Sequence, residues 1–200
     1  MGLFSKIKAV FNSKKIAVKS IEKAIEIKKV ALIVGHGNGD SGAMGWNGVS
    51  EFDYNASVAS AIEMSLTEKE VKVFYRGSSG ITGVAKQAVK WGADIVIELH
   101  LNAFNGKAKG CEVLCLEGDL LSGEKAKGFA KLFCEKFNRV KRRDAGVNWI
   151  SSSDRGGLSL RSLSSTSYAI LVEPFFIDNK EEWIDPKEYA AFLKEWIKGL

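Results

Sequence analysis

The stretch VALIVGHGNGDSGAMG, residues 30–45, decides the fold, because an apolar run ends directly in a glycine-rich segment that contains a histidine. Such a run is typical of a strand buried on both faces of a sheet. Further β-rich runs lie at 71–76, 93–103, 111–116 and 168–177, and amphipathic helical stretches lie at 50–66, 81–91, 122–138 and 186–198. This alternation predicts an α/β protein: a mixed, mostly parallel twisted sheet with helices on both faces.

Two further segments complete this outline. Asp185 and Pro186 are a good N-cap and first-turn pair for the last helix. The Ser- and Gly-rich stretch 141–167 contains no clear element, and we expect a long irregular lid or binding loop there.

Charge is distributed unevenly along the 200 residues, whose formal net charge is +5. Residues 1–30 hold eight Lys and two Glu, a net +6, which leaves −1 for residues 31–200. A basic segment therefore precedes a nearly neutral body, and we expect no nucleic-acid partner.

The sequence predicts a basic amphipathic N-terminal helical segment over residues 1–29 and one globular domain over residues 30–200. The segment could bind an anionic membrane or envelope polymer, or it could pack on the body with its lysines exposed. Lysines interrupt every apolar stretch of the segment, so we expect no signal peptide and synthesis in the cytoplasm.

Three cysteines, Cys111, Cys115 and Cys134, form no CxxC pair, and we interpret them as small buried thiols without a chemical role. Glycines 37, 39 and 42 match a dinucleotide-binding pattern formally. That pattern needs a helix at its last glycine, whereas the sequence continues as a loop, so a nucleotide site is disfavoured.

The chain has only two histidines, and both lie at or near the ends of predicted strands. His36 follows the run 30–35 and His100 lies within IELHLNA. Glu51 lies at the start of the next helix, where its side chain can turn back over the strand ends. Zn²⁺ favours such nitrogen and oxygen ligands, so His36, Glu51 and His100 predict a zinc site with an open position.

Other polar residues accompany this site. Strand alternation places Glu98 and Asn102 on the same face as His100. We expect Glu98 to be a hydrogen-bond acceptor behind the ligands or a core carboxylate, and Asn102 to be a polar partner. Glu173 ends the most apolar strand, where a buried carboxylate can exchange a proton with an attacking water.

The chain resembles the zinc-dependent N-acetylmuramoyl-L-alanine amidases of the type 3 family over about residues 30–198. The motifs that carry the resemblance are GHGNGDSGAMG (35–45), Glu51, VFYR (73–76), IELHLNA (97–103), GCEV (110–113), LSLRS (158–162) and ILVEPFFIDN (170–179). The resemblance implies that His36, Glu51 and His100 bind one zinc ion and that Glu173 is the catalytic glutamate. Arg161 is a candidate for contacting peptide carboxylates, whereas Arg76 is expected to be structural.

The sequence departs from the family pattern at four places. Asn38 stands where the family usually has Gly, Glu98 where it has Ser or Thr, and Phe175 where it has Gly, and no Pro precedes Ala169. None of these changes removes an expected ligand. Glu98 adds negative charge near the metal, which leaves the pH optimum open.

The expected activity is hydrolysis of the amide between N-acetylmuramic acid and L-alanine in bacterial peptidoglycan. Size and the expected lack of a signal peptide favour a phage-type lysin, which acts on the cell wall after release or lysis. Two alternatives remain open: a zinc peptidase or deacylase that cleaves another amide, and a non-catalytic wall-binding module.

Overall fold

The structure is a computed structural model that describes residues 26–163, 166 and 168–200. The basic helical segment expected at 1–29 lies outside these residues, except for its last four positions. Within the described residues, six strands form one sheet in the order β2-β1-β3-β6-β4-β5. The strands are β1 Lys29–Val34, β2 Glu70–Tyr75, β3 Ile95–Leu99, β4 Glu112–Leu116, β5 Val147–Ile150 and β6 Tyr168–Glu173.

The sheet is mixed and mostly parallel, as the sequence predicts. Strands β2, β1, β3 and β6 are parallel to one another. Strand β4 runs antiparallel to β6, and β5 is parallel to β4. Every residue of β3 and β6 is buried, because helices cover both faces of these central strands, and apart from Glu98 and Glu173 their residues are apolar or aromatic.

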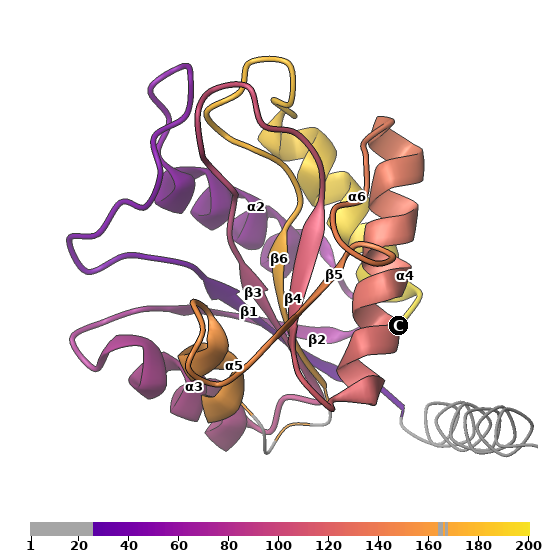
Figure 1. Cartoon of the computed structure of the whole chain (residues 1–200). Helices are drawn as coiled ribbons and strands as arrows, with labels where there is room; N and C mark the ends of the chain where they lie inside the picture. Colours follow the sequence, from indigo (N-terminus) through magenta and orange to yellow (C-terminus); the bar gives the residue numbers. More distant parts are fainter. Residues whose placement is uncertain (1–25, 164–165, 167) are drawn as a thin grey trace, which may run out of the picture.

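Helices lie on both faces of the sheet (Figure 1). Helices α2 Glu51–Ser65, α4 Leu120–Phe137 and α6 Pro186–Lys198 pack in the larger core cluster on one face. Helices α3 Gly80–Trp91 and α5 Gly157–Ser162 contribute to the cluster on the other face. The expected cap of the last helix is confirmed, since the Asp185 side chain accepts a hydrogen bond from the Lys187 N–H and Pro186 is the first helical residue.

Some boundaries differ from the sequence expectation. The strands expected at 93–103 and 168–177 end earlier, at Leu99 and Glu173, because the chain leaves the sheet to form the site. The expectation of an irregular stretch at 141–167 is wrong, since it contains β5 and α5. These elements have four and six residues, too few for a hydrophobic period to be recognised.

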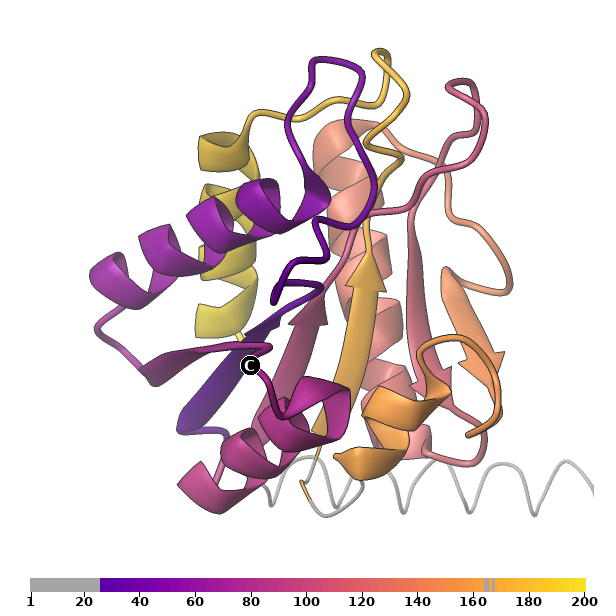
Figure 2. The same cartoon turned by 90° about the vertical axis from the view of Figure 1, so that its left-hand side faces the viewer.

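The sheet brings three distant chain segments to one edge. The register pairs Val34 with Leu99 and Leu99 with Val172, so the residues that follow β1 and β3 lie beside the end of β6. Figure 2 shows the loops after these three strands at the same end of the sheet. Strand β4 runs in the opposite direction, so Glu117, which follows it, lies at the far edge.

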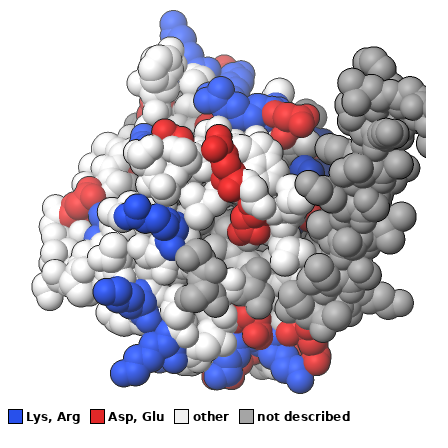
Figure 3. All heavy atoms as spheres, turned by 60° about the horizontal axis from the view of Figure 1, so that its bottom comes forward, with Lys and Arg blue, Asp and Glu red and all other residues white. Residues whose placement is uncertain are grey.

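Charged residues of both signs occur on the described surface (Figure 3), and the three cysteines lie in the core. Figure 3 shows Lys and Arg side chains interspersed with acidic and uncharged residues on one face. All three cysteines are buried and unpaired, as expected, and burial raises the pKa of the Cys115 thiol to about 12. Between residues 26 and 200, the described helices include none with the length and apolar character that crossing a membrane requires.

Candidate metal centre and active site

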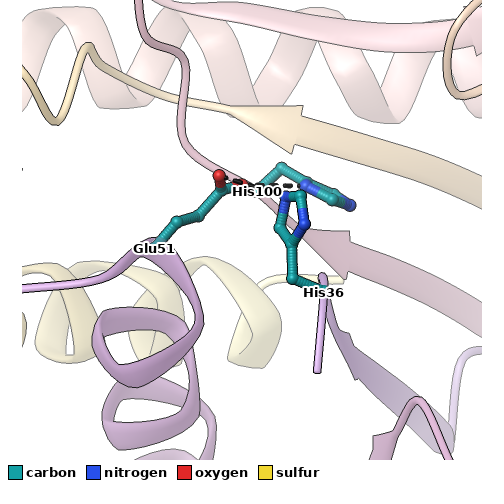
Figure 4. Close-up of side chains that lie close together, drawn as sticks. All are labelled: His36, Glu51 and His100. Atoms are coloured by element: carbon teal, nitrogen blue, oxygen red, sulfur yellow. Dashed lines mark hydrogen bonds and ion pairs between the residues drawn. The ribbon is translucent and has the colours of Figure 1, made fainter. Parts of the chain in front are cut away.

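Three elements deliver the expected ligand residues to one point (Figure 4). His36 lies two residues beyond the end of β1, and its backbone adopts a left-handed φ of 65°. His100 directly follows β3. Glu51 is the first residue of α2, whose start is fixed by Ser50, because the Ser50 side chain accepts a hydrogen bond from the Asp53 N–H at 3.1 Å.

The three side chains converge closely. Glu51 Oε1 lies 2.9 Å from His100 Nδ1, and Glu51 Oε2 lies 3.1 Å from His36 Nε2. The two imidazole rings meet edge to face with centroids 4.9 Å apart. One ligand atom from each residue lies within 4.8 Å of the others. The structure thus brings together the three residues that the sequence selects as ligands.

The remaining nitrogen of each imidazole is held by a carboxylate. His36 Nδ1 lies 2.8 Å from Asp40 Oδ2, and His100 Nε2 lies 3.1 Å from Glu98 Oε1. The Ser159 hydroxyl donates a hydrogen bond to the other oxygen of Glu98. Carboxylates behind ligating histidines fix the ring orientation and the tautomer. Each ring can therefore present its inner nitrogen to a metal.

The donor set fits a zinc ion. His36 Nε2 is buried and lacks a hydrogen bond of proper geometry, although it faces the Glu51 carboxylate. Such a buried nitrogen is costly unless a partner occupies its lone pair. Two imidazoles and one carboxylate are the protein ligands of one known class of catalytic zinc site.

Burial and charge perturb the three groups strongly. Burial raises the pKa of Glu51, but the close His100 and His36 rings and the hydrogen bond from the Ala43 N–H outweigh it and hold the pKa well below its usual range. Burial lowers the pKa of His100, yet Glu51 and Glu98 raise it overall to about 10. The carboxylates therefore make this end of the sheet a strong site for positive charge.

Two glycines leave room for these side chains. A Cβ at Gly35 would lie 2.4 Å from His100 Cε1, so only glycine permits the ring to lie this close to the backbone that directly follows β1. A Cβ at Gly42 would lie 2.6 Å from His36 Cδ2 and 2.7 Å from Glu51 Oε2, and φ at Gly42 is +67°. Gly35 and Gly42 therefore permit close packing around the ligand residues.

Glu173 ends β6 beside the trio. The Asn102 side-chain amide donates hydrogen bonds to Glu173 Oε2 at 3.0 Å and to Glu112 Oε1 at 2.8 Å. Burial raises the pKa of Glu173, His100 and Arg155 lower it, and the charges of Glu112 and Glu51 add to the rise. A buried carboxylate with a raised pKa is suited to accept and return a proton.

The sequence interpretation missed Glu112 as a site residue. The antiparallel register of β4 and β6 places it directly opposite Glu173. Arg142 Nε lies 3.1 Å from Glu112 Oε1 and Arg143 Nε lies 3.5 Å from Glu112 Oε2, which offsets the repulsion between the two carboxylates. Glu112 occurs in the GCEV motif, but only the pairing of β4 with β6 reveals its neighbour.

Of the two arginines considered from the sequence, Arg76 lines the cavity beside Glu173 and Arg161 does not. Arg161, the substrate candidate, lies exposed in the last turn of α5 and is not part of the cavity beside Glu173. Arg76 and Arg155 line that cavity instead. Arg76 Nη1 lies 3.5 Å from Asp40 Oδ2, so it supports the carboxylate that holds His36. Arg155 was missed because it lies in the stretch SSSDRGG, which shows no periodicity.

Comparison with known proteins agrees with this geometry. The family model described as N-acetylmuramoyl-L-alanine amidase matches residues 30–196, and the chain belongs to this family. No protein with a curated function matches the sequence.

Solved structures show the same fold. The catalytic domain of the CD27L endolysin targeting Clostridia difficile is 25% identical, with a TM-score of 0.64 over 86% of this chain and 97% of that one. Ami1, an N-acetylmuramyl-L-alanine amidase from Mycobacterium abscessus, is 18% identical, with a TM-score of 0.66 over 88% and 99%. Cwp6 from Clostridium difficile is 29% identical, with a TM-score of 0.63, and the match covers 87% of this chain and 28% of Cwp6.

Proposed function

We propose that the chain hydrolyses the amide between N-acetylmuramic acid and L-alanine in peptidoglycan, with one Zn²⁺ held by His36, Glu51 and His100. The observation that carries the proposal is the convergence of these three side chains beside the buried Glu173. Membership of the amidase family supports the choice of substrate. The His₂Glu donor set and the carboxylate behind each histidine support zinc as the metal.

The reaction is a hydrolysis without a covalent enzyme intermediate. A bound zinc ion supplies Lewis acidity toward the carbonyl and lowers the pKa of water. Glu173 accepts a proton from the water that attacks the lactyl carbonyl carbon, and a C–O bond forms. Glu173 then delivers this proton to the alanine nitrogen as the C–N bond breaks. Asn102 holds the Glu173 carboxylate for both transfers by donating to its Oε2.

Glu98 is proposed as a positioning residue for the metal. Its carboxylate accepts a hydrogen bond from the outer N–H of His100 and another from the Ser159 hydroxyl. This arrangement supports a role behind the ligands, because the carboxylate orients the ring. The residue thus replaces the Ser or Thr of the family pattern with a charged acceptor.

Digestion of purified peptidoglycan tests the proposal. Mass spectrometry should detect whole stem peptides with free L-alanine amino termini, and a chelator should abolish their release until zinc is restored. Glu173→Gln should lose at least 100-fold in rate, roughly the contribution of general acid–base catalysis, and should still bind one zinc ion. Glu117→Gln, at the far edge of the sheet, is the matched control and should retain activity.

The other outcomes identify the alternatives. Cleavage within the stem peptide would indicate a zinc peptidase or deacylase. Binding to the wall without release of any fragment would indicate a non-catalytic binding module. Near-normal turnover by Glu173→Gln would show that another group transfers the proton.

The cellular setting is also proposed. A phage-type lysin that reaches the wall after release or lysis is supported by the similarity to an endolysin catalytic domain. Residues 1–29 are proposed as a separate segment that binds an anionic membrane or envelope polymer. The eight lysines within these 29 residues support this proposal. Removing residues 2–28 should reduce binding to anionic liposomes; unchanged binding with lower thermal stability would assign the segment to packing on the domain.

A further inference from the structure

A cavity of about 230 Å³ lies directly against the candidate active site. His36, His100 and Glu173 line it on the side of the proposed chemistry, and Arg76 and Arg155 contribute two guanidinium groups. A second cavity of about 360 Å³ also reaches Glu173 and Arg155. Arg155 therefore lies between the two spaces through which a substrate can extend from Glu173.

The two arginines have different partners. Arg76 is an ion-pair partner of Asp40 and its side chain is largely covered. Arg155 is exposed, and among the residues that the structure describes no hydrogen bond or ion pair engages its guanidinium. Its charge acts on Glu173 through space. The donors of Arg155 are thus free to receive a ligand that enters beside Glu173.

The loop that carries Arg155 is well defined. The Ser151 N–H donates to Asp154 Oδ2 at 2.7 Å, and the Gly157 N–H donates to the Asp154 carbonyl at 2.9 Å. Gly156 adopts φ of +83° and is the N-cap residue directly before α5. These bonds fix the backbone on both sides of Arg155, which reduces the entropy lost when its side chain binds a ligand.

We propose that Arg155 recognises a carboxylate on the peptide side of the scissile amide and so favours stem peptides that keep a free carboxylate next to the first alanine. This inference rests on the proposed function. The muramoyl side is uncharged once its lactyl group is an amide, whereas the peptide carries carboxylates. A guanidinium presents paired donors that match a carboxylate, and a carboxamide lacks both the charge and the second acceptor.

The test compares two peptidoglycan preparations that differ in one group: the residue after the first alanine carries a free carboxylate in one and the matching carboxamide in the other. The wild-type protein should release the carboxylate-bearing peptides with a kcat/KM roughly ten- to one-hundred-fold higher, the range expected for charge-assisted hydrogen bonds. Arg155→Ala should lose this preference, mainly through KM, and Arg155→Lys should restore part of it.

Arg161→Ala is the matched control, because Arg161 lies only six residues away but outside the cavity. It should keep the wild-type preference. Equal preference in the wild type and Arg155→Ala would overturn the inference. If Arg155→Ala instead lowered kcat equally on both preparations, the inference would also be overturned, and Arg155 would be assigned to supporting Glu173 in the reaction. If the wild type released no stem peptide from either preparation, the proposed function itself would fail.

Discussion

His100 is held from both sides by carboxylates, and the two contacts serve different ends. Glu51 Oε1 lies 2.9 Å from Nδ1 while its other oxygen faces His36, whereas Glu98 Oε1 lies 3.1 Å from the second ring nitrogen, Nε2. Sequence spacing of two along a strand suggested that Glu98 would not share a metal with His100. The side-chain contact agrees with a role behind the ring.

We expect Glu98→Ser to weaken zinc binding about 10- to 100-fold, because the outer N–H of His100 loses its charged acceptor. The affinity is measured by competition with a coloured chelator, independently of turnover. Glu117→Ser is the control for the same chemical change far from the site. An affinity of Glu98→Ser equal to the wild type would show that the carboxylate is not needed to orient the ring.

The loop between β1 and α2 is the element that assembles the site. It carries His36 and Asp40, reaches Glu51 at the helix start, and allows the Ala43 N–H to donate to Glu51 Oε2 at 3.0 Å. Strands β4 and β6 make the second contribution, because their register sets Glu112 opposite Glu173. Asn102 then joins both carboxylates.

Gly42→Ala should abolish tight zinc binding, because its Cβ would collide with His36 and Glu51. Gly39→Ala is a matched control: its φ of +89° also disfavours alanine, but nothing lies within 4 Å of its Cβ. Both variants strain the backbone, so their difference in zinc affinity isolates the crowding. An equal loss of zinc affinity in the two variants would mean that backbone strain alone disturbs the loop.

The whole molecule is stabilised by a core divided by the sheet. The larger cluster contains aromatic rings of α4 and α6 that contact one another, among them Phe129, Phe133, Phe192 and Trp196. Phe133 is fully buried, whereas its neighbour Leu132 is 47% exposed. The packing of these two helices therefore depends on one face of α4.

Phe133→Ala should lower the free energy of unfolding by about 3–5 kcal/mol, because it removes a buried ring and leaves a cavity. Leu132→Ala should cost less than about 1 kcal/mol, as expected for a substitution outside the core. Urea denaturation followed by circular dichroism measures both. Similar losses for the two variants would contradict the assignment of Phe133 to the core.

The sequence by itself determined the α/β class, the main helices and the three residues that meet at the candidate metal centre. These features follow from local periodicity and from the rule that parallel strands end at the same edge of a sheet. Both can be applied to the sequence alone. The tertiary structure alone decided the short elements β5 and α5 and the antiparallel pairing of β4. It also decided that Glu112 faces Glu173 and that Arg155, not Arg161, lines the cavity. Which strands become neighbours and where a loop leads result from packing between residues far apart in the chain, and the periodicity of a single segment does not report them.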